Sequence, residues 1–444
     1  MAHGGVGPAG RRAEGHRVTT TVAADGDEKA ARTGAGGLPA RAKVAVAAGK
    51  VTGAVSRAAG RGSGAVIGGR VALRLDPELL GRLTTGRACV LVSATNGKTT
   101  TTRLAAEALR AIGPVASNAL GANMPAGITA AMAQDRDARF AVIEVDEKYL
   151  PTVAEQTRPK AIALLNLSRD QLDRAAETRM LAQRWRDGLA GTAATLVANA
   201  DDPLVVWAAG LAQHVVWVAA GQSWQEDAWS CPQCGGVLHR PDEDWGCASC
   251  DFRRPEPAWA LEGDALRDPQ GGRVELTGLR LPGRANRANA TTAAAVASLF
   301  GVDAQVAVKR MEQVTAVAGR YDTVRYRGRA LRLLLAKNPA GWLETFDLVS
   351  GTDHPVLLSV NALSADGTDT SWLWDVDYTR LRGRPVLVIG QRRLDLAVRL
   401  QVAGVDFTVY DDVDAAVDAA PPAQIVEVIA NYTAFQQLRQ RVGA

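Results

Sequence analysis

One stretch of the chain constrains its fold most: an apolar run that leads directly into a glycine-lysine-threonine loop. Residues 88–92 read as a short buried strand, the loop follows, and residues 101–112 have the apolar spacing of a helix. A strand, a short loop and a helix in this order form a phosphate site, because backbone N–H groups at the helix N-terminus face the anion. We therefore expect a nucleotide to bind at Thr95, Asn96, Gly97, Lys98, Thr99 and Thr100.

Two side chains of this loop have the chemistry that a nucleotide triphosphate needs. Lys98 supplies a positive charge for the phosphates, and Thr99 can hold Mg²⁺ through its hydroxyl. A chance Gly-Lys-Thr turn is the alternative, but it would not explain the strand before the loop or the helix after it.

Further short apolar runs predict an α/β fold with a parallel sheet. Residues 140–145, 161–167 and 194–198 read as buried strands that alternate with helical stretches. A long Ala-rich helix is expected from Asn286 toward Arg320. A second, smaller Rossmann-like unit starts near Leu331, with strands at 386–389, 407–410 and 425–429. The expected domains are a central nucleotide-binding domain over 44–320 and a C-terminal domain over 325–444.

Composition excludes several classes of protein. The chain has 444 residues, 47% of them hydrophobic, which is enough for two or three domains. Its net charge is only +4, with no Lys/Arg block interleaved with aromatics, so nucleic acid is not an expected partner. No apolar run reaches the roughly 20 residues of a membrane span, which predicts a cytoplasmic protein. Residues 1–40 are poor in large apolar side chains and are expected to form a disordered tail.

Four of the five cysteines form two Cys-x-x-Cys pairs with metal-ligand spacing. Twelve residues separate Cys231 and Cys234 from Cys247 and Cys250, a pattern that suits tetrahedral binding of Zn²⁺ by four thiolates. Because four cysteines leave no open position, we expect a structural zinc in an insert over 228–256. A redox pair would need only one Cys-x-x-Cys. The fifth cysteine, Cys89, lies in a strand and is expected to be a buried structural thiol.

The loop is not a standard Walker A loop, because Val92 stands where that pattern has its first glycine. Its Thr-Asn-Gly-Lys-Thr-Thr sequence instead resembles the loop of the Mur ligase and folylpolyglutamate synthetase family. Ala94 replaces a glycine that usually precedes the threonine in that family. The resemblance implies ATP and Mg²⁺ as cofactors and the formation of an amide bond.

An acidic strand end also resembles the family. Glu144 stands where these ligases have a carboxylate that coordinates Mg²⁺, and the same edge of a parallel sheet carries the phosphate loop. A solvated acid at the end of a strand is the alternative. Asp146 and Glu147 are weaker candidates.

Several asparagines and one arginine resemble the family's nucleotide contacts. Asn199 and Asp202 lie in an Asn-x-Asp-Asp-Pro segment, although such clusters are also ordinary turns. Asn286 and Asn289 resemble the pair that opens the adenine-contacting helix, where asparagine is otherwise a good N-cap. Arg320 resembles the arginine of a Gly-Arg pair that closes the central domain.

Several differences from the conventional Mur ligases indicate which group of the family the chain resembles. Only about 50 residues expected to be ordered precede Ala94, too few for a uridine-nucleotide-binding domain. No lysine lies between Lys160 and Lys309, so the family's carbamylated lysine is missing or replaced, and Gln171 stands where many members have histidine. With the cysteine insert and the segments 337–341 and 366–375, the chain resembles the MurT group of the family, the ligase subunits of lipid II isoglutaminyl synthases.

This resemblance implies a reaction and a partner. ATP would activate the α-carboxyl of D-glutamate in the lipid II stem peptide as an acyl phosphate, and ammonia would convert it to D-isoglutamine for peptidoglycan synthesis at the inner face of the cytoplasmic membrane. Releasing ammonia from glutamine needs a nucleophile, yet Cys89 has no evident histidine partner. The resemblance implies that a partner, a class I glutamine amidotransferase subunit of the GatD type, releases the ammonia.

In such a complex an Asp of the ligase subunit is thought to orient the histidine of the amidotransferase. We expect Asp369 in this role and treat Asp366 as the competitor, although Asp366 also fits a turn. Trp372 and Trp374 alternate as in a strand and fit either a core or an interface.

Two other readings remain open. A stand-alone Mur or folylpolyglutamate-type ligase would add an amino acid instead of ammonia, and the missing lysine argues against it. A nucleotide-regulated scaffold without catalysis is disfavoured because Lys98, Thr99 and Glu144 occur together.

Overall fold

The computed structural model describes residues 37–59, 64–118, 122–169, 178–222, 224–241, 244–315, 321–423 and 425–443. Residues 1–36 of the expected tail lie outside this part of the chain, as do Gln171 and Arg320. Leu38 is buried against the core, so the packed body begins before residue 40.

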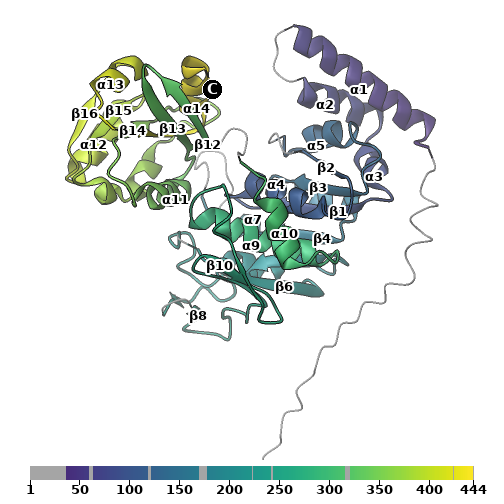
Figure 1. Ribbon diagram of the computed structural model, residues 1–444. Coiled ribbons are helices and arrows are strands. Elements are labelled where there is room, and N and C mark those ends of the chain that lie inside the picture. The colour runs from purple at the N-terminus through teal and green to yellow at the C-terminus, as the bar shows by residue number, and fades with distance from the viewer. Residues whose placement is uncertain are drawn as a thin grey trace, which may run out of the picture. The chain divides into compact units, whose positions relative to one another are not determined.

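The central domain is built on a nine-stranded sheet with the order β11-β10-β9-β6-β5-β4-β1-β3-β2 (Figure 1). The strands from β2 to β9 in this order pair in parallel, and only the pairs β9 with β10 and β10 with β11 are antiparallel. The sheet therefore has a carboxyl edge at which loops meet, as the strand predictions required. Its strands are β1 (Ala88–Ser93), β2 (Val115–Ser117), β3 (Phe140–Glu144), β4 (Ala161–Leu164), β5 (Thr195–Asn199), β6 (His214–Ala219), β9 (Trp259–Glu262), β10 (Ala265–Arg267) and β11 (Arg273–Glu275).

Helices cover both faces of this sheet, and β1 shows why. Its residues alternate between the two layers: Cys89 and Leu91 pack in one apolar cluster, Val90 and Val92 in the other. The first cluster takes in α3 (Leu79–Thr84), α5 (Pro125–Met132), α6 (Leu150–Thr157), α7 (Thr178–Gly188) and α8 (Pro203–Ala209). The second takes in α4 (Lys98–Leu109), α9 (Arg284–Ser298) and α10 (Ala304–Met311). A strand buried on both faces explains the continuous apolar run in the sequence.

The helical spacing before the loop becomes α1 (Ala40–Ala58) and α2 (Ala65–Leu75), which lie side by side (Figure 1). The cysteine-bearing insert contains a two-stranded antiparallel ribbon of β7 (Leu238–His239) and β8 (Gly246–Cys247).

The C-terminal domain has a six-stranded sheet with the order β12-β13-β17-β14-β15-β16. All pairs except β12 with β13 are parallel, in agreement with the Rossmann-like prediction. Its strands are β12 (Tyr321–Tyr326), β13 (Arg329–Leu335), β14 (Val356–Ser359), β15 (Val386–Ile389), β16 (Phe407–Val409) and β17 (Ile425–Ala430). Its helices are α11 (Pro339–Val349), α12 (Arg393–Val402), α13 (Val413–Ala419) and α14 (Tyr432–Val442), with short 3₁₀ turns η1 (Ser371–Asp375) and η2 (Tyr378–Leu381).

Two secondary-structure expectations are wrong. The long helix after Asn286 is two helices, because Gly301 adopts a left-handed φ of 81° and the Asp303 side chain caps the start of α10. The alternation of Trp372 and Trp374 is not a strand but the 3₁₀ turn η1. Trp372 packs in the core, whereas Trp374 is exposed and lies against the Arg399 guanidinium.

Candidate functional site

The phosphate loop follows β1 and ends where α4 begins, at Lys98. Gly97 adopts a left-handed φ of 84°, and a Cβ there would lie 2.7 Å from Oδ1 of Asn289. Only glycine fits this position, both for its backbone and for the space beside it. Lys98, Thr99 and Thr100 occupy the first turn of α4, whose N–H groups have no acceptor within the helix. The local structure is therefore the strand, loop and helix N-terminus that the sequence predicted, an arrangement that suits an anion.

Hydrogen bonds hold the phosphate loop against the segment that follows β4. The backbone N–H of Asn96 donates to Oδ1 of Asn166 (2.9 Å), and the amide of Asn166 donates back to the Asn96 carbonyl (3.0 Å). Thr95 exchanges two hydrogen bonds with the Ser168 backbone (3.0 and 3.1 Å). Asn166 and Ser168 were not expected as site residues, although the segment that they begin resembles one in the family.

Lys98 is buried, and its ammonium is already held by protein acceptors. Nζ donates to the carbonyls of Ala94 and Thr95 and pairs with Oε2 of Glu147 at 3.0 Å. The indole of Trp185 donates to the Glu147 carbonyl at 2.8 Å. Glu147, the weaker candidate in the sequence, is thus the acid that positions the loop lysine.

Glu144 ends β3 and is buried, which argues against a solvated strand-end acid. The side-chain amide of Asn118 donates to the Glu144 carbonyl and accepts from the Glu144 N–H (2.8 Å each), and Oε1 of Glu144 accepts from the Asn123 amide at 3.2 Å. Oε2 is buried without a hydrogen-bond partner. A buried carboxylate oxygen without a partner is costly, and a hard cation such as Mg²⁺ would satisfy it.

A cavity opens beside the loop and collects several of the predicted residues. Asn96, Gly97, Asn199 and Asn289 all line it, together with the segment Ala220–Gln222 that follows β6. The carboxyl ends of β1, β4, β5 and β6 therefore meet the N-terminal turns of α9 in one place, as expected for a ligand site in a parallel α/β sheet.

Asn286 does not line this cavity. It is buried, and its amide donates to the Pro282 carbonyl at 2.6 Å. The N-cap of α9 is Gly283, so the alternative of an asparagine N-cap on this helix is wrong.

Asp202 is buried and does not line the cavity. One carboxylate oxygen caps α8 by accepting from Leu204 N–H (2.9 Å), and the other accepts from Leu167 N–H (2.8 Å). Burial raises the pKa of Asp202 from 3.8 to about 6, although these backbone donors act in the opposite direction. Asp202 thus ties the β5 turn to the chain after β4.

The C-terminal domain reaches the loop through one asparagine. Asn338 caps α11 and accepts from the Asn96 amide at 3.2 Å, and Ala340 and Glu344 of α11 line the cavity. The segment 337–341 carried part of the family resemblance, but the sequence did not show which of its residues faces the loop.

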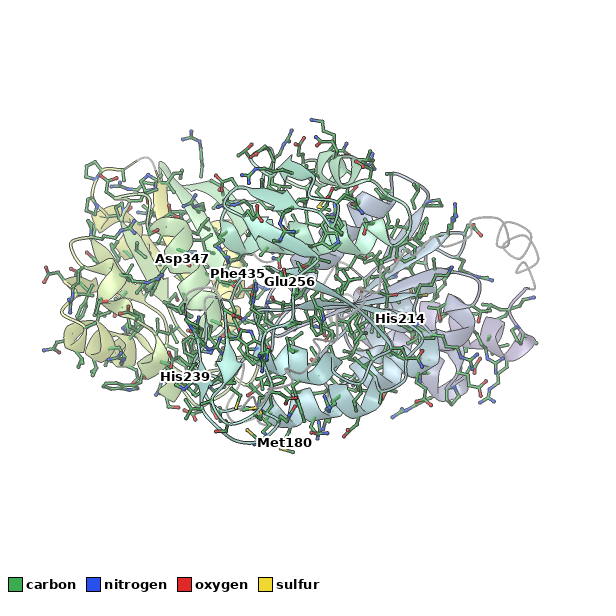
Figure 2. The ribbon with its side chains drawn as sticks, turned by 90° about the horizontal axis from the view of Figure 1, so that it is seen from below. Met180, His214, His239, Glu256, Asp347 and Phe435 are labelled. Atoms are coloured by element: carbon green, nitrogen blue, oxygen red, sulfur yellow. The ribbon has the colours of Figure 1, made fainter. Side chains whose placement is uncertain are left out.

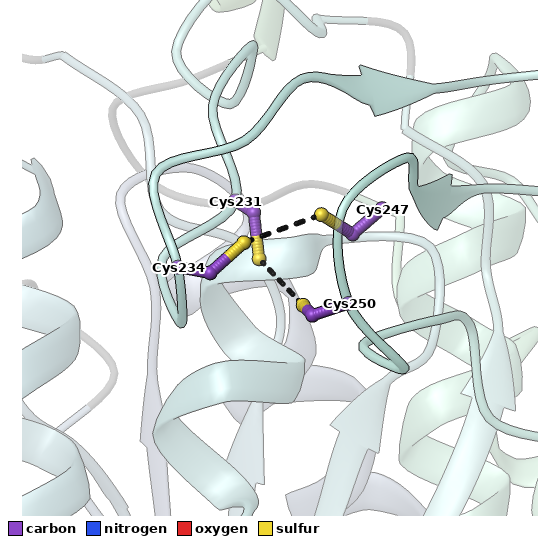
Figure 3. A group of neighbouring side chains, drawn as sticks. All are labelled: Cys231, Cys234, Cys247 and Cys250. Atoms are coloured by element: carbon purple, nitrogen blue, oxygen red, sulfur yellow. Dashed lines mark hydrogen bonds between the residues drawn. The ribbon is translucent and has the colours of Figure 1, made fainter.

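The four cysteines of the insert converge, as their spacing predicted (Figure 3). Their sulfurs all lie within 4.8 Å of one another. Backbone N–H groups of Gly236 and Ser249 donate to Cys234 Sγ (3.4 Å) and Cys247 Sγ (3.3 Å), and the Ser249 N–H lowers the pKa of Cys247 to about 7. Clustered thiols with N–H donors suit a thiophilic metal ion.

The insert packs on the turn that carries Asn199. The indole of Trp245 donates to the Ala200 carbonyl (2.9 Å), and Arg254 pairs with Asp201 (2.7 Å). Cys231 and Trp245 share an apolar cluster with Val206 of α8. A metal at the cysteines would thereby hold one wall of the cavity in place.

The two acidic candidates of the C-terminal domain differ. Both carboxylate oxygens of Asp366 accept from Thr433 at the start of α14, so this residue has a structural role. Asp369 is exposed, and its Oδ1 accepts from Ser371 N–H at 2.8 Å.

No cysteine–histidine pair is found among the described residues. Cys89 is buried in the apolar core, burial raises its pKa to about 12, and its thiol donates to the Thr84 carbonyl at 3.9 Å. His214 and His239 are exposed on β6 and β7 and lie well apart in Figure 2, and His354 pairs with Glu427. Within the part of the chain that the structure describes, no helix is long and apolar enough to cross a bilayer.

Comparisons with known proteins agree with these features. The family model of the Mur ligase middle domain matches residues 92–231, and that of the MurT ligase C-terminal domain matches residues 335–435. A relative from Streptococcus pneumoniae, the lipid II isoglutaminyl synthase (glutamine-hydrolyzing) subunit MurT, is 30% identical over 77% of this chain and 83% of its own length. The protein of that name from Staphylococcus aureus strain COL is 29% identical over 81% and 87%.

Solved structures share the fold at lower identity. The pseudomurein peptide ligase type C of Methanothermus fervidus superposes with a TM-score of 0.62 at 17% identity, covering 83% of this chain and 80% of that one. The folylpolyglutamate synthase of Mycobacterium tuberculosis, complexed with ADP, gives 0.58 at 15% identity, covering 83% and 93%.

Proposed function

This chain belongs to the MurT family of Mur ligases, and we propose that it is the ATP-dependent synthetase subunit of a glutamine-hydrolysing lipid II isoglutaminyl synthase. The observation that carries the proposal is the carboxyl edge of the central sheet. There a phosphate loop, a buried acid with one oxygen unpaired and an asparagine-lined cavity stand together. ATP use follows from the loop, and the substrate follows from the family.

The reaction would proceed in two steps. A carboxylate oxygen of the D-glutamate α-carboxyl attacks the γ-phosphorus of ATP, giving an acyl phosphate and ADP. Ammonia then attacks the acyl carbon, phosphate leaves, and a proton is lost, giving D-isoglutamine. The product is an amidated precursor of peptidoglycan, made at the inner face of the cytoplasmic membrane where lipid II is anchored.

Different residues around the loop would contact different parts of the nucleotide. Backbone N–H groups from Gly97 to Thr100 would receive the phosphates, while Lys98 exchanges its loop carbonyls for phosphate oxygens and stays near Glu147. Asn199 and Asn289 would contact the nucleotide from the cavity walls. Asn286 and Asp202 would act by holding α9 and the β5 turn, and Arg320 stays a proposed nucleotide contact outside the described residues.

Glu144 and Thr99 would hold Mg²⁺, and the unpaired Oε2 of Glu144 fits this role. Mg²⁺ would supply charge neutralisation at the phosphates. The four cysteines would hold a structural Zn²⁺ within the insert over 228–256 of the central domain, proposed to span 44–320.

Ammonia would come from a GatD-type class I glutamine amidotransferase that forms a heterodimer with this chain. Because Cys89 is buried and has no histidine partner among the described residues, this chain lacks a visible glutaminase nucleophile. Asp369, exposed on the C-terminal domain that begins with β12, would orient the partner's histidine.

The test is an amidation assay on lipid II with two ammonia sources. The purified chain should amidate lipid II with ATP and ammonium, but with glutamine only after the amidotransferase is added. Full activity with glutamine in the absence of a second subunit would contradict the partner assignment. Transfer of an amino acid instead of ammonia would favour a stand-alone ligase.

The residue assigned to the partner's triad can be tested in the same assay. Asp369→Asn should lower glutamine-dependent turnover by about 100-fold or more and leave ammonium-dependent turnover unchanged, because only the glutaminase needs it. Asp366→Asn is the matched variant, and it should affect stability instead through the loss of its Thr433 contacts. Full glutamine-dependent activity of Asp369→Asn would remove the residue from the triad.

A further inference from the structure

The helices α1 and α2 form a preformed pair outside the nucleotide site (Figure 1). They cross at glycines: a Cβ on Gly68 would lie 2.4 Å from the Gly49 carbonyl oxygen, and one on Gly53 would lie 3.1 Å from the Gly64 carbonyl oxygen. Such close backbone packing fixes the two helices against each other and leaves the opposite side of α1 free of the protein core. That side is a rigid surface without an assigned role.

The outer side of α1 carries an aliphatic row. Val44, Val51 and Val55 are 61%, 64% and 63% exposed, and their spacing places them on one face of the helix. The opposite face, with Ala42, Ala45, Gly49, Gly53 and Ser56, packs on α2 and the core. These three valines form an apolar stripe, and the charges around the stripe distinguish it from other exposed aliphatic residues of the chain.

A basic row runs along a second side of α1, turned by about 100° or more around the helix axis from the valines. Lys43, Lys50 and Arg57 are exposed and follow one another at seven-residue intervals, which keeps them on one line along α1. Arg70 and Arg74 of α2 are exposed as well. The segment 38–75 contains seven Lys and Arg residues and no Asp or Glu, whereas the whole chain has a net charge of only +4. The remainder of the chain is therefore net negative, and the positive charge is concentrated on this helix pair.

We propose that the outer face of α1, together with the adjoining basic residues of α2, docks on an anionic lipid bilayer. A row of aliphatic side chains and a row of cations on different sides of one helix are the pattern of a helix that lies in the plane of a membrane interface. Anionic headgroups complement a helix pair whose segment 38–75 contains no carboxylates, and the valines enter the headgroup boundary without any need for specific shape. An acidic protein partner would match the charge equally, but nothing in the valine row forms a pocket for its side chains.

The inference goes beyond the proposed function and does not rest on it, because bilayer binding is measured without lipid II or ATP. If the proposed function also holds, docking brings the cavity of the central domain to the surface that carries its substrate. An enzyme that amidates lipid II in detergent but never binds vesicles would refute only the docking proposal.

The experiment is co-sedimentation of the full chain with vesicles of equal parts phosphatidylglycerol and phosphatidylcholine, compared with phosphatidylcholine alone. The wild type should bind the anionic vesicles and lose most of that binding at high salt. The variant Lys43→Gln/Lys50→Gln/Arg57→Gln should bind about 100-fold more weakly, since each cation near an anionic surface contributes roughly fivefold. The variant Val44→Ser/Val51→Ser/Val55→Ser should also lose binding, without a change in salt dependence.

A matched control uses another exposed aliphatic row. Leu394, Val398 and Val402 on α12 are 69%, 51% and 63% exposed, and their triple serine variant should bind vesicles as the wild type does. Thermal unfolding and ammonium-dependent amidation in detergent should be unchanged in all three variants, which separates docking from folding.

Three outcomes would overturn the proposal. The first is equal binding to neutral and anionic vesicles by the wild type and both α1 variants. The second is self-association that the valine variant abolishes, which would make a second copy the partner of this face. The third is vesicle binding that is lost after removal of residues 1–36 alone, which would make that segment, and not α1, the membrane contact.

Discussion

The carboxyl edges of the two sheets are both formed by segments that follow parallel strands, but they carry different polar side chains. In the central sheet the edge holds buried charges, Lys98, Glu144 and Glu147, and one carboxylate oxygen is left without a partner. In the C-terminal sheet the edge is closed by amides: Asn361 N–H donates to Asn431 Oδ1 (3.0 Å), and the Asn431 amide donates to the Asn361 carbonyl (2.7 Å).

The glycines at the two edges show the same contrast. Gly97 opens onto the first turn of a helix beside a cavity, whereas a Cβ on Gly390 would lie 2.8 Å from the Val360 carbonyl oxygen. The lone glycine after β15 packs against its own sheet and is followed by no lysine or threonine. The comparison shows that a parallel sheet always has a carboxyl edge where loops meet. Polar groups that lack a protein partner at this edge are what indicate a ligand-binding site.

The largest effect is expected from removing the loop cation. Lys98→Ala should lower ATP-dependent amidation by at least about 100-fold, because a buried positive charge at the phosphates is lost. The matched change at the other edge is Gln391→Ala, which removes a side-chain contact to Ala362 N–H and should leave the rate within about twofold. Initial rates of ammonium-dependent amidation measure both, and similar losses for both variants would break the comparison.

The unpaired oxygen gives the next prediction. Glu144→Gln should lower amidation by about 100-fold and raise the free energy of unfolding by about 1 kcal/mol, since an uncompensated buried charge is removed. Denaturant unfolding and activity are measured on the same preparation. A variant that loses both stability and activity would show that Glu144 is structural.

The cysteine cluster should act on the nucleotide from a distance. Removing the metal with a chelator should lower the melting temperature and weaken nucleotide binding by about tenfold, because the insert holds the turn that carries Asn199. Cys231→Ser should reproduce both changes, and Cys89→Ala, a thiol outside the cluster, should reproduce neither. Unchanged nucleotide affinity after metal loss would separate the insert from the site.

The smallest effect concerns pH. Burial raises the pKa of Asp202 to about 6, so the folded protein holds this proton more tightly than the unfolded chain does between about pH 4 and 6. Lowering the pH from 7 to 5 should therefore add about 1 kcal/mol of stability through Asp202 in the wild type, but not in Asp202→Asn. The destabilisation caused by Asp202→Asn should be larger at pH 5 than at pH 7, and urea unfolding at the two values checks the sign.

Strand positions and the phosphate loop could be predicted from sequence because their signals are local. Buried parallel strands are continuous apolar runs, and the loop residues are consecutive. The cysteine cluster could also be predicted, because the spacing of two Cys-x-x-Cys pairs is typical of four cysteines that converge on one metal ion. Glu144 could be placed because a carboxylate at a strand end must lie at the edge of the sheet.

Long-range contacts could not be predicted. The pairing of Lys98 with Glu147, the amide exchange of Asn96 with Asn166, and the burial of Asp202 all depend on how segments meet in three dimensions. The break between α9 and α10 was missed because alanine-rich sequence masks a single glycine. The two tryptophans of η1 were misread because a 3₁₀ turn and a strand both allow aromatic residues two positions apart.

One measurement tests the central claim, that this chain activates a carboxylate with ATP at the edge of the central sheet. Lipid II labelled with ¹⁸O in the D-glutamate α-carboxyl is incubated with the chain, ATP and ammonium, and the phosphate formed is analysed by mass spectrometry. An acyl phosphate requires one labelled oxygen in the phosphate for each amide made, and Lys98→Ala should yield neither product at a comparable rate. Amide formation accompanied by unlabelled phosphate would contradict the account.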